Sequence, residues 1–305
     1  MKVAALKHTP STLPISIVPG AQPTLLRELE TLLHTLCIYG ALGITAFGWA
    51  LGRLLGWDAA PWMPLWFCAA LLVYNADRLR RDPADSLNIP LREAASARLR
   101  VLSFIVLAAS ALVLLGLPIL RRDWLTLALV LGGALICLNY SIPLFGFRFK
   151  DVPLLKTFFA PTIVTASVLG LPWLHLRPGS IDPGTLALTA LRSWSFLLFN
   201  MIICDLRDRA GDEACGIRSL PVVLGEKGTR RLLAALLGGI EVLALSAYAL
   251  ASDTHRASWA IICLLGPMYL GGLLLAVRRP RSERFYEWVV EGMLFLPAIA
   301  VCSGM

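Results

Sequence analysis

Long runs of apolar residues recur along the chain, and the charged residues gather in the short stretches between them. About 20 apolar residues suffice for a helix to cross the hydrocarbon core of a bilayer. Three runs of that length carry no charge: 101–120, 124–147 and 257–277. Six further runs are slightly shorter or carry one or two charges: 35–52, 60–76, 157–174, 183–204, 232–252 and 288–305. Because lipid offers no partners to backbone polar groups, the pattern predicts an all-α membrane protein, a bundle of nine transmembrane helices.

The chain is predicted to have two parts, which meet just before the first apolar run. Residues 1–33 hold four prolines and no apolar run followed by a cleavage site, so we expect a soluble leader and no signal peptide. A short interfacial helix is expected at 25–33. Residues 34–305 form the predicted nine-helix domain.

Composition and charge agree with a membrane location. Only 16% of the residues are charged, against about 25% in soluble domains. If the N-terminus lies inside, the inner segments hold 22 of the 28 Lys and Arg residues, which places them in the cytoplasm. We therefore expect a multi-pass protein of the cytoplasmic membrane. The net charge of +8 then indicates contact with lipid, and no basic soluble domain suggests nucleic acid as a partner.

Two acidic stretches follow the second and the sixth predicted helix. Four helices separate them, so both should open onto the same cytoplasmic face. The first contains Asp77, Asp82 and Asp85, and the second Asp205, Asp208 and Asp212. Hard divalent cations prefer oxygen ligands, and Mg²⁺ bound there would neutralise a leaving diphosphate. The seven cysteines and four histidines show no metal-ligand spacing, so zinc or haem is not expected.

The second acidic stretch has the more regular spacing. Its aspartates lie three and four residues apart, so a helical turn would place all of them on one face. Gly211 and Gly216 would let the backbone bend close to a ligand. The alternative is a solvated interfacial loop, but three acids on one face are unusual in a predominantly basic inner surface.

Two segments carry a resemblance to a known family. The segment DLRDRAGDEACGIRSLPVVLG, which begins at Asp205, resembles the second aspartate-rich motif of the UbiA-type intramembrane prenyltransferase superfamily. NYSIPLFGFRFKDVPLLK, after the fourth run, is similar to the family's Tyr-Ser-x-Pro segment and the basic residues that follow it. The resemblance extends over most of the chain. It implies a cytoplasm-facing central cavity and Mg²⁺-dependent transfer of a prenyl group from an isoprenoid diphosphate to a lipophilic, usually aromatic, acceptor.

The resemblance also implies roles for individual residues. The metal-side residues would be Asp77, Asp82, Asp85, Asp205, Asp208 and Asp212. The diphosphate would be held by Asn75, Lys150, Lys156 and Arg218. The catalytic set would be Asp77, Asp82, Asp208 and Tyr140. The ring of Tyr140 would stabilise an allylic cation by cation–π attraction, and its alternative role is an aromatic anchor at the interface.

The first acidic stretch departs from the family pattern, Asn-x-x-x-Asp-x-x-x-Asp. The residue four positions after Asn75 is a leucine. Asp77 and Asp85 keep an eight-residue separation, but Arg81 then occupies the middle acidic place. The alternative is one helical face shared by Asn75, Arg78, Asp82 and Asp85. Because Pro83 biases the residue before it out of the helix, the metal ligands within this stretch stay open.

Two ionisable residues fall inside predicted helices at similar depth, Arg192 in the sixth and Glu241 in the seventh. We expect them to pair and to brace these two helices, because intramembrane charges usually have a partner. A weaker alternative makes Glu241 a proton acceptor.

Three functions are compatible with these features. The leading hypothesis is prenyl transfer from a long isoprenoid diphosphate, although the sequence does not fix the chain length or the acceptor. A terpene cyclase would use the same ionisation without a second substrate. A transporter or structural protein is the third, but charges concentrated at one surface favour a surface-opening site over a midplane path.

Overall fold

The computed structural model describes residues 25–80, 82–177 and 179–304. Every regular element in these ranges is helical, which confirms the predicted all-α class. The α-helices are α1 (Leu25–Thr35), α2 (Ile38–Leu55), α3 (Met63–Leu79), α4 (Pro83–Asn88), α5 (Pro90–Arg98), α6 (Arg100–Leu120), α7 (Trp124–Ser141), α8 (Leu155–Thr165), α9 (Leu171–Trp173), α10 (Pro183–Ala214), α11 (Leu220–Leu250), α12 (Asp253–Ala276) and α13 (Leu296–Gly304). Short 3-10 or π segments are η1 (Phe149–Asp151), η2 (Ala166–Gly170), η3 (Phe285–Val290) and η4 (Met293–Phe295).

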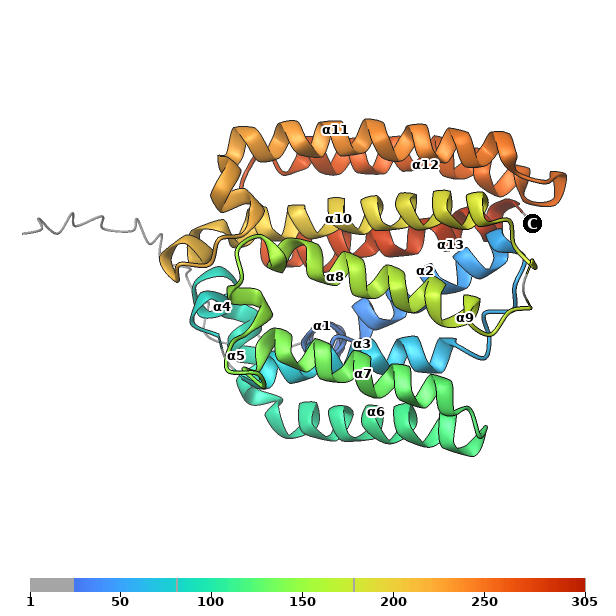
Figure 1. The fold of residues 1–305 in the computed structure, drawn as a ribbon. Helices are drawn as coiled ribbons and strands as arrows, with labels where there is room; N and C mark the ends of the chain where they lie inside the picture. Colours follow the sequence, from blue (N-terminus) through green and yellow to red (C-terminus); the bar gives the residue numbers. More distant parts are fainter. Residues whose placement is uncertain (1–24, 81, 178, 305) are drawn as a thin grey trace, which may run out of the picture.

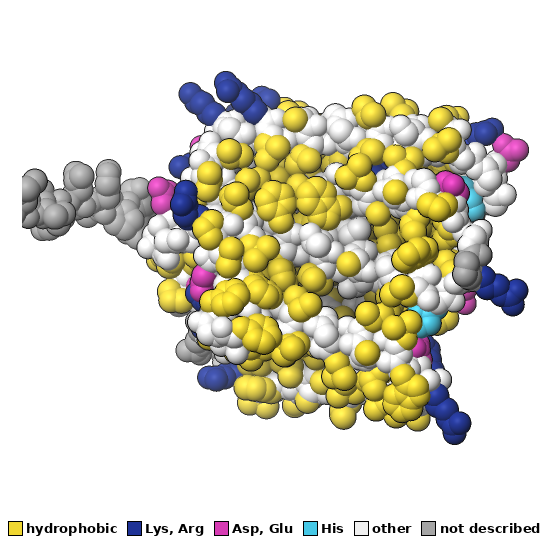
Figure 2. All heavy atoms as spheres, in the orientation of Figure 1, with side chains coloured by type: hydrophobic (Ala, Val, Ile, Leu, Met, Phe, Trp, Pro, Cys, Tyr) yellow, Lys and Arg dark blue, Asp and Glu magenta, His cyan; other side chains and the backbone are white. Residues whose placement is uncertain are grey.

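Eight of the helical segments are long and apolar enough to cross a membrane. They are α2, α6, α7, the run α8–η2–α9, α10, α11, α12 and the run η3–η4–α13. The 17-residue α3 lies among them in the bundle (Figure 1). The expected count of nine is compatible with this arrangement. Hydrophobic side chains cover the flank of the bundle and charged ones gather at its two ends (Figure 2), as in an integral membrane protein.

Several helices do not end where their apolar runs end. Helix α10 continues ten residues past the predicted end at 204, so the second acidic stretch is helical and is not a loop. The helix ends at Ala214, and Gly216 follows with a φ of +74°, the left-handed conformation that closes many helices. Helix α7 stops at Ser141, six residues early, because Pro143 follows. The length of an apolar run therefore indicates which part of a helix lies in lipid. The residue at which the helix ends depends on helix-terminating residues such as Gly216 and Pro143.

One end of the bundle holds the elements that carry both acidic stretches. The short helices α4 and α5, the connection between α7 and α8, and the end of α10 all lie there, and the C-terminus lies at the opposite end (Figure 1). The end of α1 is held there too, because the Arg78 guanidinium donates to the carbonyls of His34 and Thr35. Helix α1 covers the helix expected at 25–33. Residues 1–24 of the expected leader lie outside the described residues.

Candidate active site

The first acidic stretch runs from the last turns of α3 to the short helix α4. Asp77 accepts a hydrogen bond from the Ser141 hydroxyl, and its carboxylate lies 3.6 Å from the Lys150 ammonium. Asp82 begins α4, and its side chain accepts a hydrogen bond of 3.0 Å from the Ala84 amide. An aspartate that caps a helix stabilises it, because the first amides of a helix have no other partner.

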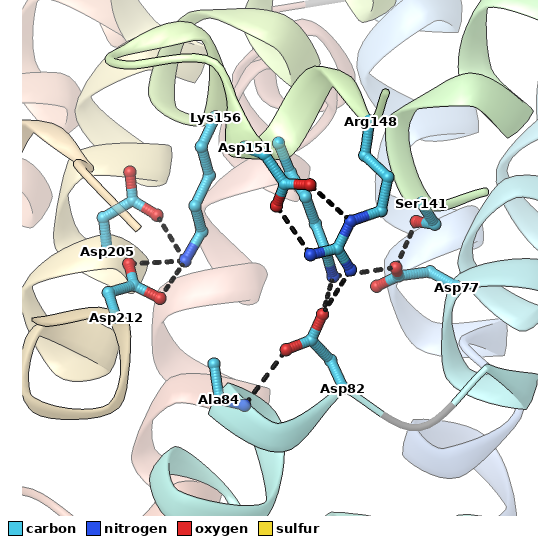
Figure 3. A network of polar contacts seen from close by, with 10 residues as sticks. Asp77, Asp82, Ala84, Ser141, Arg148, Asp151, Lys156, Asp205 and Asp212 are labelled. Carbon is cyan, nitrogen blue, oxygen red and sulfur yellow. Dashed lines mark hydrogen bonds and ion pairs between the residues drawn. The ribbon is translucent and has the colours of Figure 1, made fainter. Parts of the chain in front are cut away.

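The other carboxylate oxygen of Asp82 has two cationic partners. It lies 2.6 Å from the Lys150 ammonium and 3.0 Å from the Arg148 guanidinium, which also binds Asp151 through two hydrogen bonds of 2.6 and 2.7 Å (Figure 3). Burial alone would raise the pKa of Asp82, but the hydrogen bond and charge of Lys150, with the Ala84 amide and Arg148, hold it below its usual range. Asp82 is therefore an ionised carboxylate whose charge is already balanced.

Asp85, one turn further along α4, has no hydrogen bond or ion pair through its side chain in the part of the chain that the structure describes. Burial, followed by the negative charge of Asp77, raises the pKa of Asp85 to about 6. The charge of Asp208 acts on it in the same direction. Since Asp77 and Asp208 belong to different acidic stretches, the two stretches face one common site, as the even number of helices between them predicts.

Lys156 joins two aspartates of the second stretch. Its ammonium lies 2.6 and 2.7 Å from the two oxygens of Asp212 and 3.6 Å from Asp205 (Figure 3). Asp205 and Asp212 are seven residues apart, two helical turns, so they share one face of α10. Asp205 is fully buried and accepts a 2.5 Å hydrogen bond from the Thr157 hydroxyl, which in turn accepts from the Leu220 amide at 3.2 Å.

The third aspartate of this stretch has a different partner. Asp208 accepts two hydrogen bonds from the neighbouring Arg207, at 2.6 and 3.0 Å. The Arg207 guanidinium also lies over the Tyr286 ring, 5.1 Å from its centroid. Gly211, one turn further, remains helical, and its amide donates to Asn88 of α4 at 2.9 Å. A Cβ at this position would collide with Asn88, so the glycine allows α4 to approach and does not bend the backbone.

Tyr140 lies between the two acidic stretches. Its ring stacks on Phe159 with centroids 4.8 Å apart. Its charged neighbours include carboxylates of both stretches, Asp77, Asp205 and Asp212. This position is compatible with the expected contact to an allylic cation.

Asn75 and Arg218 are also predicted to bind the diphosphate, but their surroundings differ from those of Lys150 and Lys156. The Asn75 amide nitrogen donates to the carbonyls of Leu36 and Leu71, at 3.0 and 2.8 Å, inside the bundle. The side chain of Arg218 is exposed, and its carbonyl accepts from the Leu154 amide at 2.9 Å. Arg81, the middle residue of the first stretch, lies outside the described residues.

Four residues of the site carry no role in the sequence interpretation: Ser141, Arg148, Thr157 and Arg207. Ser141 and Arg148 belong to the quoted segment NYSIPLFGFRFKDVPLLK, and Thr157 follows it directly. Their partners are 48 to 66 residues away in the chain, so the sequence alone gave no sign of these pairs. Arg207 next to Asp208 was visible, but a neighbour in sequence usually points to another face of a helix.

The donor set fits a hard divalent cation. In 25–80, 82–177 and 179–304, no three carboxylate, histidine or cysteine side chains converge closely enough to hold a metal as they stand. Three of the carboxylates are instead paired with Lys150, Lys156 and Arg207. However, Asp205 keeps one fully buried oxygen, Oδ1, without a hydrogen-bond partner in the described residues, and its nearest cation is the Lys156 ammonium at 3.6 Å. A buried carboxylate oxygen of this kind favours a cation beside it.

The two mid-membrane charges do not contact each other directly among the described residues. The Arg192 side chain is 2% exposed, and its guanidinium lies 5.4 Å from the centroid of the Trp259 ring. Arg192 and Glu241 influence each other electrostatically across this region. Bracing of α10 and α11 by this pair stays a prediction.

The sequence pattern described as the UbiA prenyltransferase family matches residues 84–296. The chain belongs to the UbiA prenyltransferase family. The match covers α4 to the start of α13 and begins after Asp82, so most of the first acidic stretch precedes it.

Named UbiA relatives are distant. The chain is 30% identical over 143 residues to chlorophyll synthase of Arabidopsis thaliana, covering 46% of this chain and 34% of that protein. It is 29% identical over 217 residues to naringenin 8-dimethylallyltransferase 2 of Sophora flavescens, covering 68% of this chain and 52% of that protein. The chain thus matches about a third to a half of the length of these relatives. Its fold is similar to that of a UbiA homologue from Archaeoglobus fulgidus bound to GPP and Mg²⁺, with a TM-score of 0.61, 15% identity, and coverage of 90% of this chain and 99% of that one.

Proposed function

We propose that this protein is a prenyltransferase that moves a prenyl group from an isoprenoid diphosphate to a lipophilic, aromatic acceptor. Family membership supports the reaction class. The observation that carries the proposal is the pair of lysines that follow α7: Lys150, in η1, and Lys156, in the first turn of α8, each reach a different acidic stretch. In the proposed site, these two lysines would bind diphosphate oxygens once metal ions balance the carboxylates beside them.

Mg²⁺ is the proposed cofactor, and Asp77, Asp85, Asp205, Asp208 and Asp212 would hold it. When bound, it neutralises the charge of the diphosphate and so makes that group a better leaving group. Asp82 is proposed to act beside them by fixing the Lys150 ammonium. Lys150, Lys156 and Arg148 then supply positive charge where negative charge develops on the diphosphate.

The proposed reaction breaks the bond between the allylic carbon and the diphosphate oxygen, and the electron pair leaves with the diphosphate. The face of the Tyr140 ring, fixed by its stacking on Phe159, stabilises the cationic carbon. The acceptor supplies the electron pair for the new bond and loses a proton to solvent at the open end of the site. The distribution of Lys and Arg supports a cytoplasmic site in the cytoplasmic membrane.

The test is release of diphosphate by purified protein in nanodiscs, with and without Mg²⁺. The substrates are dimethylallyl, geranyl, farnesyl and geranylgeranyl diphosphates, with a membrane lipid extract as the source of acceptor. We expect Mg²⁺-dependent release that Asp208→Asn abolishes. Asp253→Asn, an exposed aspartate at the opposite end of the bundle, is the matched control. Absence of release from all four substrates would contradict the proposal, and a terpene product formed without extract would indicate a cyclase.

A further inference from the structure

A cavity lies at the end of the bundle opposite the two acidic stretches. Its volume is about 290 Å³, close to the lower limit of about 300 Å³ for small-molecule pockets. The lining comes from the ends of α2 and α11, the beginnings of α10 and α12, and the connection that leads into α10. These helix ends lie on the same side of the bundle as the C-terminus (Figure 1). Asp182 in this lining and Asp205 are 23 residues apart along the chain, roughly 35 Å of helix, so the cavity is separate from the candidate active site.

The beginnings of two helices supply most of the polar side of this cavity. Asp182 and Thr185 come from the start of α10, and Ser252 and His255 from the start of α12. Among the described residues that line the cavity, Asp182 is the only acid, and none is a lysine or an arginine. The lining therefore carries one negative charge and favours a cationic group over an anionic one.

The carboxylate of Asp182 has one oxygen available. Its Oδ2 accepts hydrogen bonds from the Thr185 amide at 2.7 Å and from the Thr185 hydroxyl at 3.1 Å, which caps α10. Its Oδ1 has no hydrogen bond or ion pair in the part of the chain that the structure describes. The Ser252 hydroxyl and the half-buried His255 ring also form no hydrogen bond to any described residue. The cavity thus presents an unpaired acceptor together with two groups that can donate hydrogen bonds.

The other side of the cavity is apolar and continues onto the flank of the bundle. Ala247 of α11 and Trp259 of α12 are buried in its wall, whereas Leu250, which also lines it, is 68% exposed. Leu245, further along α11, is 55% exposed. The lining spans residues 182–189 of α10, roughly 10 Å, and the head-group layer of one leaflet is about 5 to 8 Å thick. An occupant can therefore place a polar head in the cavity and an apolar chain along α11.

We propose that this cavity binds the head group of a zwitterionic phospholipid that carries a primary ammonium, a phosphatidylethanolamine. The ammonium donates to Oδ1 of Asp182, the phosphate accepts from Ser252 and His255, and an acyl chain lies along the exposed leucines of α11. A primary ammonium has N–H donors for the free oxygen, whereas the quaternary ammonium of phosphatidylcholine has none. Phosphatidylglycerol would bring a negative charge to Asp182 without a cation to balance it. This lipid site is independent of prenyl transfer.

The experiment is native mass spectrometry of the full chain in detergent, titrated with phosphatidylethanolamine, phosphatidylcholine or phosphatidylglycerol of identical acyl chains. The Kd of the first bound lipid should be about tenfold lower for phosphatidylethanolamine than for the other two, the effect of one hydrogen bond to a charged group. Asp182→Asn keeps the helix cap but removes the charge, so it should bind phosphatidylethanolamine and phosphatidylcholine equally. Asp253→Asn, an exposed acid at the same end and outside the lining, should keep the preference.

A second variant assigns the bound lipid to this cavity. Ala247→Phe fills the space from α11 and should raise the Kd for phosphatidylethanolamine about tenfold, while an unchanged rate of diphosphate release shows that the bundle is folded. Equal affinity of the wild type for phosphatidylethanolamine and phosphatidylcholine would overturn the proposal. So would tightest binding of phosphatidylglycerol, or a preference that persists in Asp182→Asn. Lipid binding is measured without isoprenoid substrate, so failure of diphosphate release in the wild type would contradict the proposed function alone.

Discussion

The two acidic stretches hold their carboxylates in different ways, although each has three aspartates. In the second stretch, all three project from one continuous helix, and Lys156 joins two of them. In the first, Asp77 lies on α3, Asp82 caps α4 and Asp85 lies on α4 itself. A helix fixes carboxylate spacing through its own backbone, whereas a helix–loop–helix segment needs partners from elsewhere in the chain to do so.

Those partners come from the connection between α7 and α8. Lys150 and Arg148 fix Asp82, while Asp85 has no ion pair among the described residues. Burial and the charge of Asp77 raise the pKa of Asp85 to about 6, although the charges of Arg92 and Lys150 act in the opposite direction. The first stretch therefore contains one balanced and one unbalanced carboxylate. The comparison suggests that the second stretch is a rigid half of the site, and that the first completes it when a ligand supplies the missing charge.

The largest effect is expected from the rigid half. Asp205→Asn keeps an oxygen that can accept from Thr157 but removes a fully buried charge. Diphosphate release should fall by about 10²- to 10³-fold, as when one electrostatic element of an active site is lost. Asp151→Asn, in η1, removes a charge held by Arg148 and should change the rate less than tenfold. Equal losses in both variants would show that the rate follows total charge and not this geometry.

The lysines of the two stretches should differ in their effect on stability. Lys156→Met leaves Asp205 and Asp212 buried without a cation, and we expect a loss of about 3 kcal/mol in the free energy of unfolding without Mg²⁺. Lys150→Met should cost less, because Asp82 keeps Arg148. The measurement is unfolding in bicelles with and without Mg²⁺, beside the exposed control Lys227→Met. Mg²⁺ should restore more stability to Lys156→Met than to the wild type, and no difference would argue against a metal beside this lysine.

Sequence patterns predicted the second acidic stretch better than the first, because the aspartates of the second stretch all lie on one helix. Spacings of three and four within one helix are readable from the chain, and so are the apolar runs that become α6, α10 and α12. Asp82 was uncertain because its position depends on the loop before Pro83 and on Arg148, which is 66 residues away. The contact of Trp66 on α3 with Gly48 on α2 was not foreseen either, since it depends on how these two helices pack.

The unbalanced carboxylate of the first stretch predicts a dependence of stability on pH. The pKa of Asp85 is raised from 3.8 to about 6, so the folded state binds its proton more tightly than the unfolded state does. Wild-type stability without Mg²⁺ should therefore fall as pH rises from about 4 to 6 and stay level above. Asp85→Asn should remove this fall and stabilise the protein at pH 7.5 by up to about 3 kcal/mol, and by about half of that at pH 5. A gain of equal size at both pH values would assign the effect to packing.

The smallest effect concerns Asp82 and distinguishes its two roles. Asparagine caps a helix about as well as aspartate, so Asp82→Ala should be about 1 kcal/mol less stable than Asp82→Asn. If Asp82 mainly fixes Lys150, Asp82→Asn should keep diphosphate release within about tenfold of the wild type, because Lys150 also lies near Asp77. A direct metal role, which the family resemblance implies, requires instead a loss comparable to that of Asp205→Asn, with a matching rise in the Mg²⁺ concentration for half-maximal activity. The two variants measured together therefore decide whether the first stretch binds metal through Asp82 or only through the aspartates on either side of it.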